Sequence, residues 1–395
     1  MQVFHGIGVG GRQYKKAARG IKFPSIKGSL SKELLRKLAP KKTQYAAVDI
    51  GSREIKVVEV STADGYPEVI ASGRLTTPAG VLGEPEGDED LVNALNEVVL
   101  YSGIQSKEVI ATISGDRVIT RHIKVPVMPA KELETAIKYE AEKFIPIPVD
   151  DLNIRYLNLG EMESDGERYL HLLLAAVPSS FVYDYYEIFI RAGLVVAAID
   201  VQSLCLWRVF CGLDTSAARA GTAGILDIGA AATQFLVVSD RGLQLSRTLP
   251  VGGNLLTQSL AENYGLEFQE AQQLKEEQGE LLSVEAAASA AAGAMQMDYS
   301  LRVGLSNLIR EIRRSLDYYA SLKDATTIDR FIISGGTSKL KGFREFFAEA
   351  MEVPVDFGHP GIPGLTGGGA AEPLPFDPAF AVAVGAALRE IVEDV

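Results

Sequence analysis

A strand–turn–strand pattern occurs twice in this chain and limits its fold more than any other feature. In the first copy, Tyr45–Val60, a short apolar run ends in a tight turn and an alternating strand returns, which is typical of strands with differently buried faces. The second copy is Gly224–Val238, and it aligns Asp227 with Asp49. An internal repeat of this length predicts two like halves, each of which presents one hairpin to a shared cleft.

Each hairpin has residue types that hold a phosphate. Glycine turns expose backbone N–H groups to an anion, and a carboxylate nearby holds a hydrated divalent cation. Two carboxylates beside a polyphosphate repel it unless a cation bridges them, so we expect Asp49 and Asp227 to hold Mg²⁺ through water. The other hairpin residues that we expect to face the phosphates are Gly51, Ser52, Lys56, Gly229 and Thr233. The alternative for Ser52, Lys56 and Thr233 is an ordinary place in an exposed hairpin or a strand.

Two further glycine-containing segments fit the same ligand. One follows the apolar strand that begins at Phe331, where glycines let a flat ring or a phosphate approach the backbone closely. The other opens a predicted helix over 255–264, whose first N–H groups suit phosphate or ribose oxygens. The residues of these segments that we assign to nucleotide binding are Gly252, Gly253, Asn254, Gly335, Gly336 and Ser338.

The two hairpins and the strand with its glycine turn from Phe331, in this order along the chain, resemble the two phosphate motifs and the adenosine motif of the actin-like ATPases, a superfamily that includes actin, MreB, FtsA, the DnaK-type chaperones and the sugar kinases. The resemblance implies an α/β actin-like ATPase fold, with two ribonuclease-H-like domains that close on ATP and Mg²⁺ around a nucleotide cleft. In that superfamily an Ala-Glu-x-x-Lys helix holds the ribose. Here the helix reads Ala271-Gln-Gln-Leu-Lys275, which implies a ribose contact from Lys275 and a weaker one from Gln272.

Hydrolysis requires a water held for in-line attack, usually by Glu, Gln or His. Many relatives place a glutamate at the helix start after Asp200, and this chain has Gln202 there. Gln orients water but is a poor base, and Ala230 and Ala231 replace glycines that are common in the second loop. We therefore expect ATP binding with slow turnover or none, with Gln202 as the catalytic candidate. The alternative is that Gln202 simply begins a helix.

Three longer stretches resemble the PilM family of type IV pilus assembly proteins, which are relatives of FtsA. They are Val127–Ile137, Glu140–Asp150 and Glu311–Tyr319, and nucleotide binding does not require them. The resemblance covers about residues 45–395 and implies a small inserted FtsA-like domain. It also implies a cytoplasmic protein at the inner face of the inner membrane, which binds the short cytoplasmic N-terminal segment of PilN and is attached to the membrane through such partners.

The patterns and the resemblance together predict a domain organisation. We expect a basic, flexible arm in 1–44, a first ribonuclease-H-like domain in 45–125 and 196–220, an inserted partner-binding domain in 126–195, and a second ribonuclease-H-like domain in 221–395 with a helical subdomain around 255–325. A turn at 114–116 predicts a β-hairpin between strands 109–113 and 118–125. Residues 354–378 are rich in Pro and Gly, which predicts an extended loop.

Charge is unevenly distributed along the chain. The net charge is −12, but residues 1–44 hold eleven Lys and Arg and one acidic residue, Glu33, so the rest carries −22. A basic arm on an acidic body suits anionic lipid or nucleic acid; we prefer a solvated tail and expect no nucleic-acid partner. Cys205 and Cys211 lie in one predicted helix, which favours buried thiols in a reducing compartment, and the four scattered histidines indicate no zinc site.

Two other functions remain open on the sequence. A filament-forming protein like FtsA or MreB would pellet with ATP in a concentration-dependent way, although the acidic C-terminal tail lacks the amphipathic membrane helix of FtsA. A small-molecule kinase of the same superfamily would release ADP only with its substrate, and no acceptor-site motif is evident. Oligomeric state does not follow from the residues.

Overall fold

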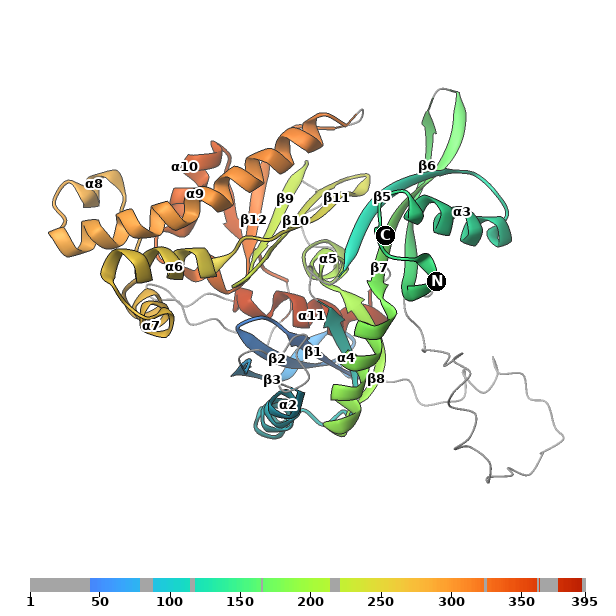
Figure 1. Ribbon diagram of the computed structural model, residues 1–395, viewed down its shortest axis with the longest axis horizontal. Helices are drawn as coiled ribbons and strands as arrows, with labels where there is room; N and C mark the ends of the chain where they lie inside the picture. Colours follow the sequence, from blue (N-terminus) through green and yellow to red (C-terminus); the bar gives the residue numbers. More distant parts are fainter. Residues whose placement is uncertain are drawn as a thin grey trace.

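The computed structural model arranges the chain around three β-sheets (Figure 1). The residues that it describes are 43–78, 88–113, 118–164, 166–213, 221–322, 325–360, 362 and 376–392. The basic arm predicted in 1–44 therefore lies outside the described residues, apart from its last two positions.

The first sheet has five strands in the order β3-β2-β1-β4-β8. Their bounds are β1 (Gln44–Ile50), β2 (Glu54–Ser61), β3 (Glu68–Thr76), β4 (Glu108–Ile113) and β8 (Val195–Val201). β1, β2 and β3 form an antiparallel meander, whereas β4 is parallel to β1 and β8 is parallel to β4. Two helices, α2 (Asp88–Ser102) and α4 (Ser179–Arg191), contact each other and bury their apolar side chains in the core of this sheet.

The second sheet repeats this plan. Its order is β11-β10-β9-β12-β13, with an antiparallel meander followed by two parallel strands. The strands are β9 (Ala223–Ile228), β10 (Thr233–Ser239), β11 (Gly242–Leu249), β12 (Arg330–Ser334) and β13 (Val355–Phe357). The helices on this side of the molecule are α6 (Gly253–Tyr264), α7 (Phe268–Gln278), α8 (Val284–Ala287), α9 (Ala292–Ala320) and α10 (Phe343–Met351) (Figure 1). The matching strand order gives the sequence repeat a structural counterpart.

The third sheet is smaller and has its own core. It pairs β5 (Ile119–Pro126), β7 (Glu167–Pro178) and β6 (Leu152–Ser164) in the order β5-β7-β6. One helix, α3 (Ala130–Glu142), covers it with residues at helical spacing, Leu133, Ile137 and Ala141, all buried. A 3₁₀ turn, η3 (Val149–Asp151), leads into β6.

The prediction that strands 109–113 and 118–125 pair as a β-hairpin is wrong. β4 pairs with β1 and β8 in the first sheet, whereas β5 pairs with β7 in the third. The turn residues and the alternation of the two strands are local signals, and they do not specify which sheet each strand joins. The apolar side of β5, with Ile123 and Val125, is buried with α3 instead.

The boundaries of the inserted unit differ from the predicted 126–195. Its sheet begins at Ile119 and ends at Pro178. The next helix, α4, buries Val182, Tyr185 and Phe189 in the core of the first sheet. The chain thus returns to the first domain as soon as the third sheet is complete.

The C-terminal segment also packs differently from the prediction that 221–395 forms one domain. It consists of η6 (Pro378–Phe380), α11 (Ala381–Ala387) and η7 (Leu388–Glu390). α11 contacts β1, β2, β4 and α5 (Gln202–Trp207), and its residues are buried in the core of the first sheet. Within the predicted loop 354–378, β13 forms an edge strand beside β12; residues 361 and 363–375 lie outside the described residues.

The middle of the molecule holds α5 and α11 between the first and second sheets (Figure 1). α5 continues as a π-helical turn, η4 (Arg208–Gly212), rather than as the regular helix predicted to Cys211. Asp200, at the end of β8, binds Arg208 of η4 at 2.6 Å and Arg389 of η7 at 3.0 Å, and all three side chains are buried. This buried cluster ties the connecting helix to the C-terminal segment.

Candidate functional site

The two hairpins singled out by the sequence have the same backbone geometry. In each, the glycine N–H donates to a carbonyl three residues later: Gly51 to Glu54 and Gly229 to Ala232, both at 3.0 Å. Each aspartate lies near the end of its strand, two residues before that glycine. The duplicated pattern therefore builds two equivalent turns.

A hydroxyl on the neighbouring parallel strand stands behind each aspartate. Thr112 on β4 donates to Asp49 Oδ1 at 2.5 Å. Ser334 on β12 is paired in register with Asp227, and its side chain opposes in part the rise in the pKa of that carboxyl that burial and Asp49 cause. In each half, a hydroxyl on the parallel strand next to the hairpin therefore lies beside the aspartate. Neither sequence motif alone indicates this arrangement.

Gln202, at the start of α5, links the two halves. Its Nε2 donates to Asp49 Oδ1 at 3.2 Å, and its Oε1 accepts from Gln234 Nε2 at 3.2 Å. Gln234 on β10 in turn accepts from Thr248 Oγ1 at 3.0 Å. The chain of amides joins the first aspartate to the second sheet through the connecting helix, and Gln202 has both ends of its side chain engaged.

The first hairpin carries its own positive charge. Lys56 lies opposite Asp49 on β2, and its Nζ is 3.9 Å from Asp49 Oδ2 and 3.8 Å from Glu54 Oε2. Ser52 is exposed at the tip of the turn. An exposed hydroxyl and a lysine beside a glycine turn are groups that bind phosphate oxygens.

The second hairpin lacks a lysine at the corresponding position, and Asp227 is electrostatically unusual. Burial and the negative charge of Asp49 raise the pKa of Asp227 to about 7. The residue as a whole is half-buried. A carboxyl with a raised pKa gains most from a cation placed beside it.

The start of α6 is closed to a phosphate by its own neighbours. The N–H groups of Gly253 and Asn254 donate to the carbonyls of Gly229 and Ala230, at 2.9 and 2.8 Å. A Cβ on Gly252 would lie 2.6 Å from the same two carbonyl oxygens. In this conformation these residues hold the second turn rather than presenting free N–H groups.

Thr233 is turned away from the turn's open side. It is fully buried, and its hydroxyl donates to the carbonyl of Val251 at 2.7 Å. Thr233 therefore has the alternative role that the sequence analysis named, an ordinary place in a strand, and in this conformation its hydroxyl does not face a phosphate.

Lys275 lies where α7 meets the start of α6. Its Nζ donates to the Gly253 carbonyl at 3.0 Å, to Thr257 Oγ1 at 2.7 Å and to Gln272 Oε1 at 2.9 Å. Burial lowers its pKa to about 8, with a further lowering by Arg53 that Glu276 opposes. The lysine predicted to contact ribose is therefore already held in a polar network.

The third motif forms a 3₁₀ turn, η5 (Gly336–Lys339), beside this network. Gly335 has φ +86° and packs on Ile228, where a Cβ would come within 2.5 Å of its backbone. A Cβ on Gly336 would meet no other atom within 4 Å, so the surface at this glycine is open. Ser338 is buried and donates to the Gly335 carbonyl at 2.8 Å, which fixes the turn and does not face outward.

Two sets of polar contacts between the halves involve residues that no sequence motif identifies. Asp377, just before η6, is buried and binds Arg74 of β3 at 2.8 Å and Lys339 of η5 at 3.5 Å. Arg53, in the first turn, lies 3.5 Å from Glu276 on α7. Neither carboxylate lies in a recognisable motif, because only the folded arrangement brings these segments together.

The site suits a hydrated magnesium ion better than a tightly caged metal. In the described part of the chain, no group of three or more His, Cys, Asp or Glu side chains is arranged to hold a metal ion directly. Mg²⁺ usually keeps several waters and is held by one or two carboxylates together with phosphate oxygens. Asp49 and Asp227, whose charges interact, provide that kind of donor set.

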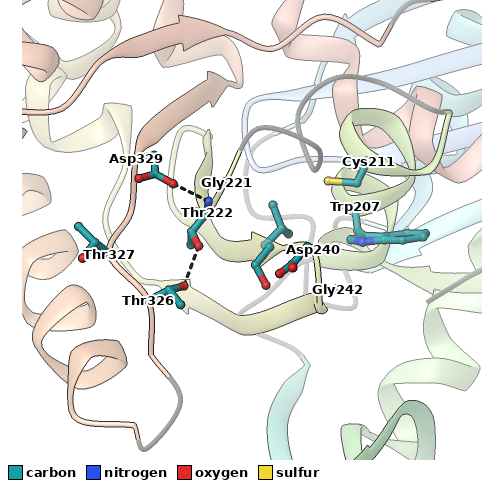
Figure 2. Close-up of a pocket in the computed structure, with 11 residues that line it drawn as sticks. Trp207, Cys211, Gly221, Thr222, Asp240, Gly242, Thr326, Thr327 and Asp329 are labelled. Carbon is teal, nitrogen blue, oxygen red and sulfur yellow. Dashed lines mark hydrogen bonds between the residues drawn. The ribbon is translucent and has the colours of Figure 1, made fainter.

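A separate cavity of about 830 Å³ lies at the other end of the second sheet (Figure 2). Thr222 and Asp329, which line it, precede β9 and β12, whereas Asp227 and Ser334 lie at the carboxyl ends of the same strands. Trp207 of α5 forms the opposite wall (Figure 2). Since ligands of open α/β sheets bind at the carboxyl ends of the strands, we place the candidate site at the two hairpins and not in this cavity.

No helix in the described ranges combines the length and the apolar character needed to cross a membrane.

Comparison with known proteins agrees with the geometry. The chain is similar to a solved structure of a PilM–PilN type IV pilus biogenesis complex, with a TM-score of 0.75 and 25% identity over 90% of this chain and 100% of that chain. It is also similar in fold to the ethanolamine utilization protein EutJ from Carboxydothermus hydrogenoformans, with a TM-score of 0.51 and 14% identity over 88% and 90% of the two chains. The actin-like α/β fold expected from the sequence is thereby confirmed.

The family is set by a match along almost the whole chain. The family model described as type IV pilus assembly protein PilM matches residues 47–391, which include both Asp-x-Gly turns, the third motif and the inserted sheet. This chain belongs to the family of the type IV pilus assembly protein PilM.

Proposed function

We propose that this chain is an ATP-binding scaffold of the type IV pilus assembly machinery at the cytoplasmic face of the inner membrane. It binds the cytoplasmic N-terminal segment of PilN, is attached to the membrane through such partners, and hydrolyses ATP slowly or not at all. The observation that carries the nucleotide part is that Gln202 connects two equivalent Asp-x-Gly hairpins, through Asp49 of the first and through Gln234, opposite Asp227, of the second. Membership of the PilM family supports the pilus role.

The residues around the turns have distinct parts in this proposal. Ser52 and Lys56 bind phosphate oxygens, while Asp49 and Asp227 hold the waters of Mg²⁺, which neutralises the phosphate charge when bound. The open surface at Gly336 receives the adenine ring. Lys275 contacts the ribose only by exchanging one of its three present acceptors.

Slow hydrolysis follows from the state of Gln202. A residue that positions an attacking water needs a free acceptor or donor directed at that water. Here the amide nitrogen of Gln202 is bound to Asp49 and its oxygen to Gln234. Freeing Gln202 costs those hydrogen bonds, and a neutral amide then remains a poor base.

The inserted sheet is the proposed PilN-binding unit. β6 is an edge strand, and on its outer side no strand of the described residues pairs with it. Such an edge accepts an extended peptide through main-chain hydrogen bonds, and an amphipathic helix offers side-chain contacts. The PilM–PilN complex that this chain resembles supports PilN as the partner.

The nucleotide part is tested by closing the open surface at the third motif. Gly336→Val places a branched side chain where the ring would lie, and we expect ATP affinity to fall at least roughly tenfold, because a ring cannot share that space. Gly293→Val is the matched control. Apart from the adjoining chain, a Cβ on either glycine would meet no atom of the described residues within 4 Å, and Gly293 belongs to a different element, α9. Isothermal titration with Mg-ATP measures both.

The outcomes separate the parts of the proposal. Equal ATP affinity in the two variants would contradict the assignment of the adenine site. Single-turnover measurement of ATP cleavage by the wild-type protein should show little ADP over many minutes. Rapid multiple turnover of ATP would contradict the proposal of slow hydrolysis or none and would indicate that the protein acts as an ATPase.

A further inference from the structure

The charged side chains of the two turns all belong to the first. After Gly51 the first turn continues with Ser52, Arg53 and Glu54, whereas the second continues from Gly229 with three alanines. The two turns share the same backbone hydrogen bond. The difference between them therefore lies in the side chains that the first turn offers to a ligand.

Arg53 reaches from the first half to a helix of the second. Its Nη2 lies 3.5 Å from Oε1 of Glu276 on α7, and the same oxygen accepts from Gln272 Nε2 at 2.6 Å. Burial is the main cause of the lowered pKa of Lys275, and the charge of Arg53 lowers that pKa further. The guanidinium thus lies beside the helix that contains Gln272 and Lys275, the two residues expected near the ribose.

The backbone of the first turn is held in place, so a change of partner at Arg53 concerns its side chain. The N–H of Thr77 donates to the Arg53 carbonyl at 3.0 Å, and Thr77 Oγ1 donates to the Gly51 carbonyl at 2.7 Å. The side chains of Arg53 and Glu276 are 35% and 55% exposed. Exposed ion pairs contribute little stability because water competes for both charges, so this contact is exchanged for another at small cost.

Lys56, the other cation of this hairpin, already lies between two carboxylates. Its Nζ is 3.9 Å from Asp49 Oδ2 and 3.8 Å from Glu54 Oε2, and its side chain is only 12% exposed. Lys56 therefore serves a bound phosphate from a fixed position. Arg53 is the cation that can change partner, and its planar fork binds phosphate through two parallel hydrogen bonds.

We propose that Arg53 distinguishes ATP from ADP by exchanging Glu276 for the terminal phosphate of ATP. The inference rests on the proposed binding of ATP and adds the residue that senses the nucleotide state. ADP lacks that phosphate, so with ADP the guanidinium stays with Glu276 and joins the first turn to α7. The contact between the halves then differs between the two nucleotides, which is the difference that a nucleotide-dependent scaffold requires.

The measurement is the ratio of the dissociation constants of Mg-ADP and Mg-ATP, by isothermal titration of the full-length protein. For the wild type we expect a ratio well above one, in favour of ATP. Arg53→Gln should lower the ratio at least roughly tenfold by weakening ATP, and should leave ADP affinity within about twofold. Arg53→Lys keeps the charge but not the planar fork, so its ratio should be intermediate.

Removing the competing carboxylate tests the exchange from the other side. Glu276→Gln frees Arg53, so the ratio should rise by roughly two- to fivefold. In the Arg53→Gln background the same change should leave the ratio unaltered, because that variant has no guanidinium to free. Glu280→Gln is the matched control, since it removes an exposed carboxylate from a pair with Lys341 and should keep the wild-type ratio. Circular dichroism first establishes that each variant folds like the wild type.

Three results overturn the inference. They are an unchanged ratio in Arg53→Gln, equal losses of ATP and ADP affinity in that variant, or a rise in the ratio on Glu276→Gln that persists without Arg53. A wild-type protein that binds neither nucleotide would refute the proposed function, and this inference with it. A wild-type protein that binds Mg-ATP with a ratio independent of Arg53 would refute the inference alone.

Discussion

At the scale of single residues, the state of Asp227 is the feature most open to measurement. Burial and the neighbouring Asp49 raise its pKa from 3.8 to about 7. The folded protein therefore binds a proton at Asp227 over a range where the unfolded chain has released it. By linkage, this residue makes the folded state less stable as pH rises through that range.

We predict that Asp227→Asn stabilises the nucleotide-free protein in a pH-dependent way. The gain over the wild type should be absent below about pH 4, grow between about pH 4 and about pH 7, and stay constant above that. Allowing for the partial exposure of the side chain, we expect roughly 1–3 kcal/mol at neutral pH. Urea unfolding in EDTA, at about pH 5 and about pH 7.5, measures the difference.

The control for this pH effect is Asp240→Asn, an exposed aspartate at the far end of the second sheet. Because Asp240 is exposed, Asp240→Asn should change the free energy of unfolding little at both pH values. An Asp227→Asn difference that is equally flat would contradict the raised pKa.

At the scale of elements, polar contacts across the middle of the molecule hold the two halves together. Asp200 joins β8 to η4 and η7 through Arg208 and Arg389. Burial alone would raise the pKa of Asp200, but the two arginines outweigh it and hold that pKa below its ordinary value. Asp377 connects β3 with η5 in a similar way.

Removing the charge of Asp200 should destabilise the protein strongly. Asp200→Asn leaves the fully buried Arg208 without its carboxylate, and breaking such a buried pair costs about 3–5 kcal/mol. Chemical denaturation compares this variant with Glu161→Gln, which breaks the exposed pair with Arg168 on the third sheet and should cost less than about 1 kcal/mol. An equal loss of unfolding free energy in the two variants would contradict the stabilising role of the buried Asp200–Arg208 pair.

At the scale of the whole molecule, the sequence predicted the actin-like fold because the repeat is local. Each Asp-x-Gly turn and its returning strand lie within one continuous segment, so residue type and spacing identify them. The pairing of β5 with β7, the return of α4 to the first core and the path of α11 depend on contacts between distant segments. Alternation and turn signals contain no information about those partners.

The same distinction applies to the candidate site. Asp49, Asp227 and Lys56 were predicted from the hairpin pattern, whereas Gln234 and Asp377 become visible only when strands and loops from different parts of the chain meet. The N–H groups of Gly253 and Asn254 were expected to be open, yet the second turn occupies them in this conformation. A sequence motif identifies a helix start but not the carbonyls that pack on it.

We propose a PilN-binding scaffold in which the nucleotide site at the two hairpins and the inserted sheet are parts of one chain. Nucleotide changes partner affinity only if the two states of the cleft differ in their contacts with the peptide-binding unit. The buried ion pairs of Asp200 and Asp377 join segments that are distant in the sequence, and the inserted sheet lies between β4 and α4 of the first domain along the chain.

The most direct measurement is the affinity of the full-length protein for a labelled peptide from the cytoplasmic N-terminus of PilN, with and without Mg-ATP, by fluorescence anisotropy. We expect the peptide to bind in both conditions, with an affinity that changes when Mg-ATP is present, and we expect this change to be lost in Gly336→Val. A peptide with the same composition in scrambled order serves as the control. Mg-ATP binding without any binding of the PilN peptide would contradict the proposed scaffold function.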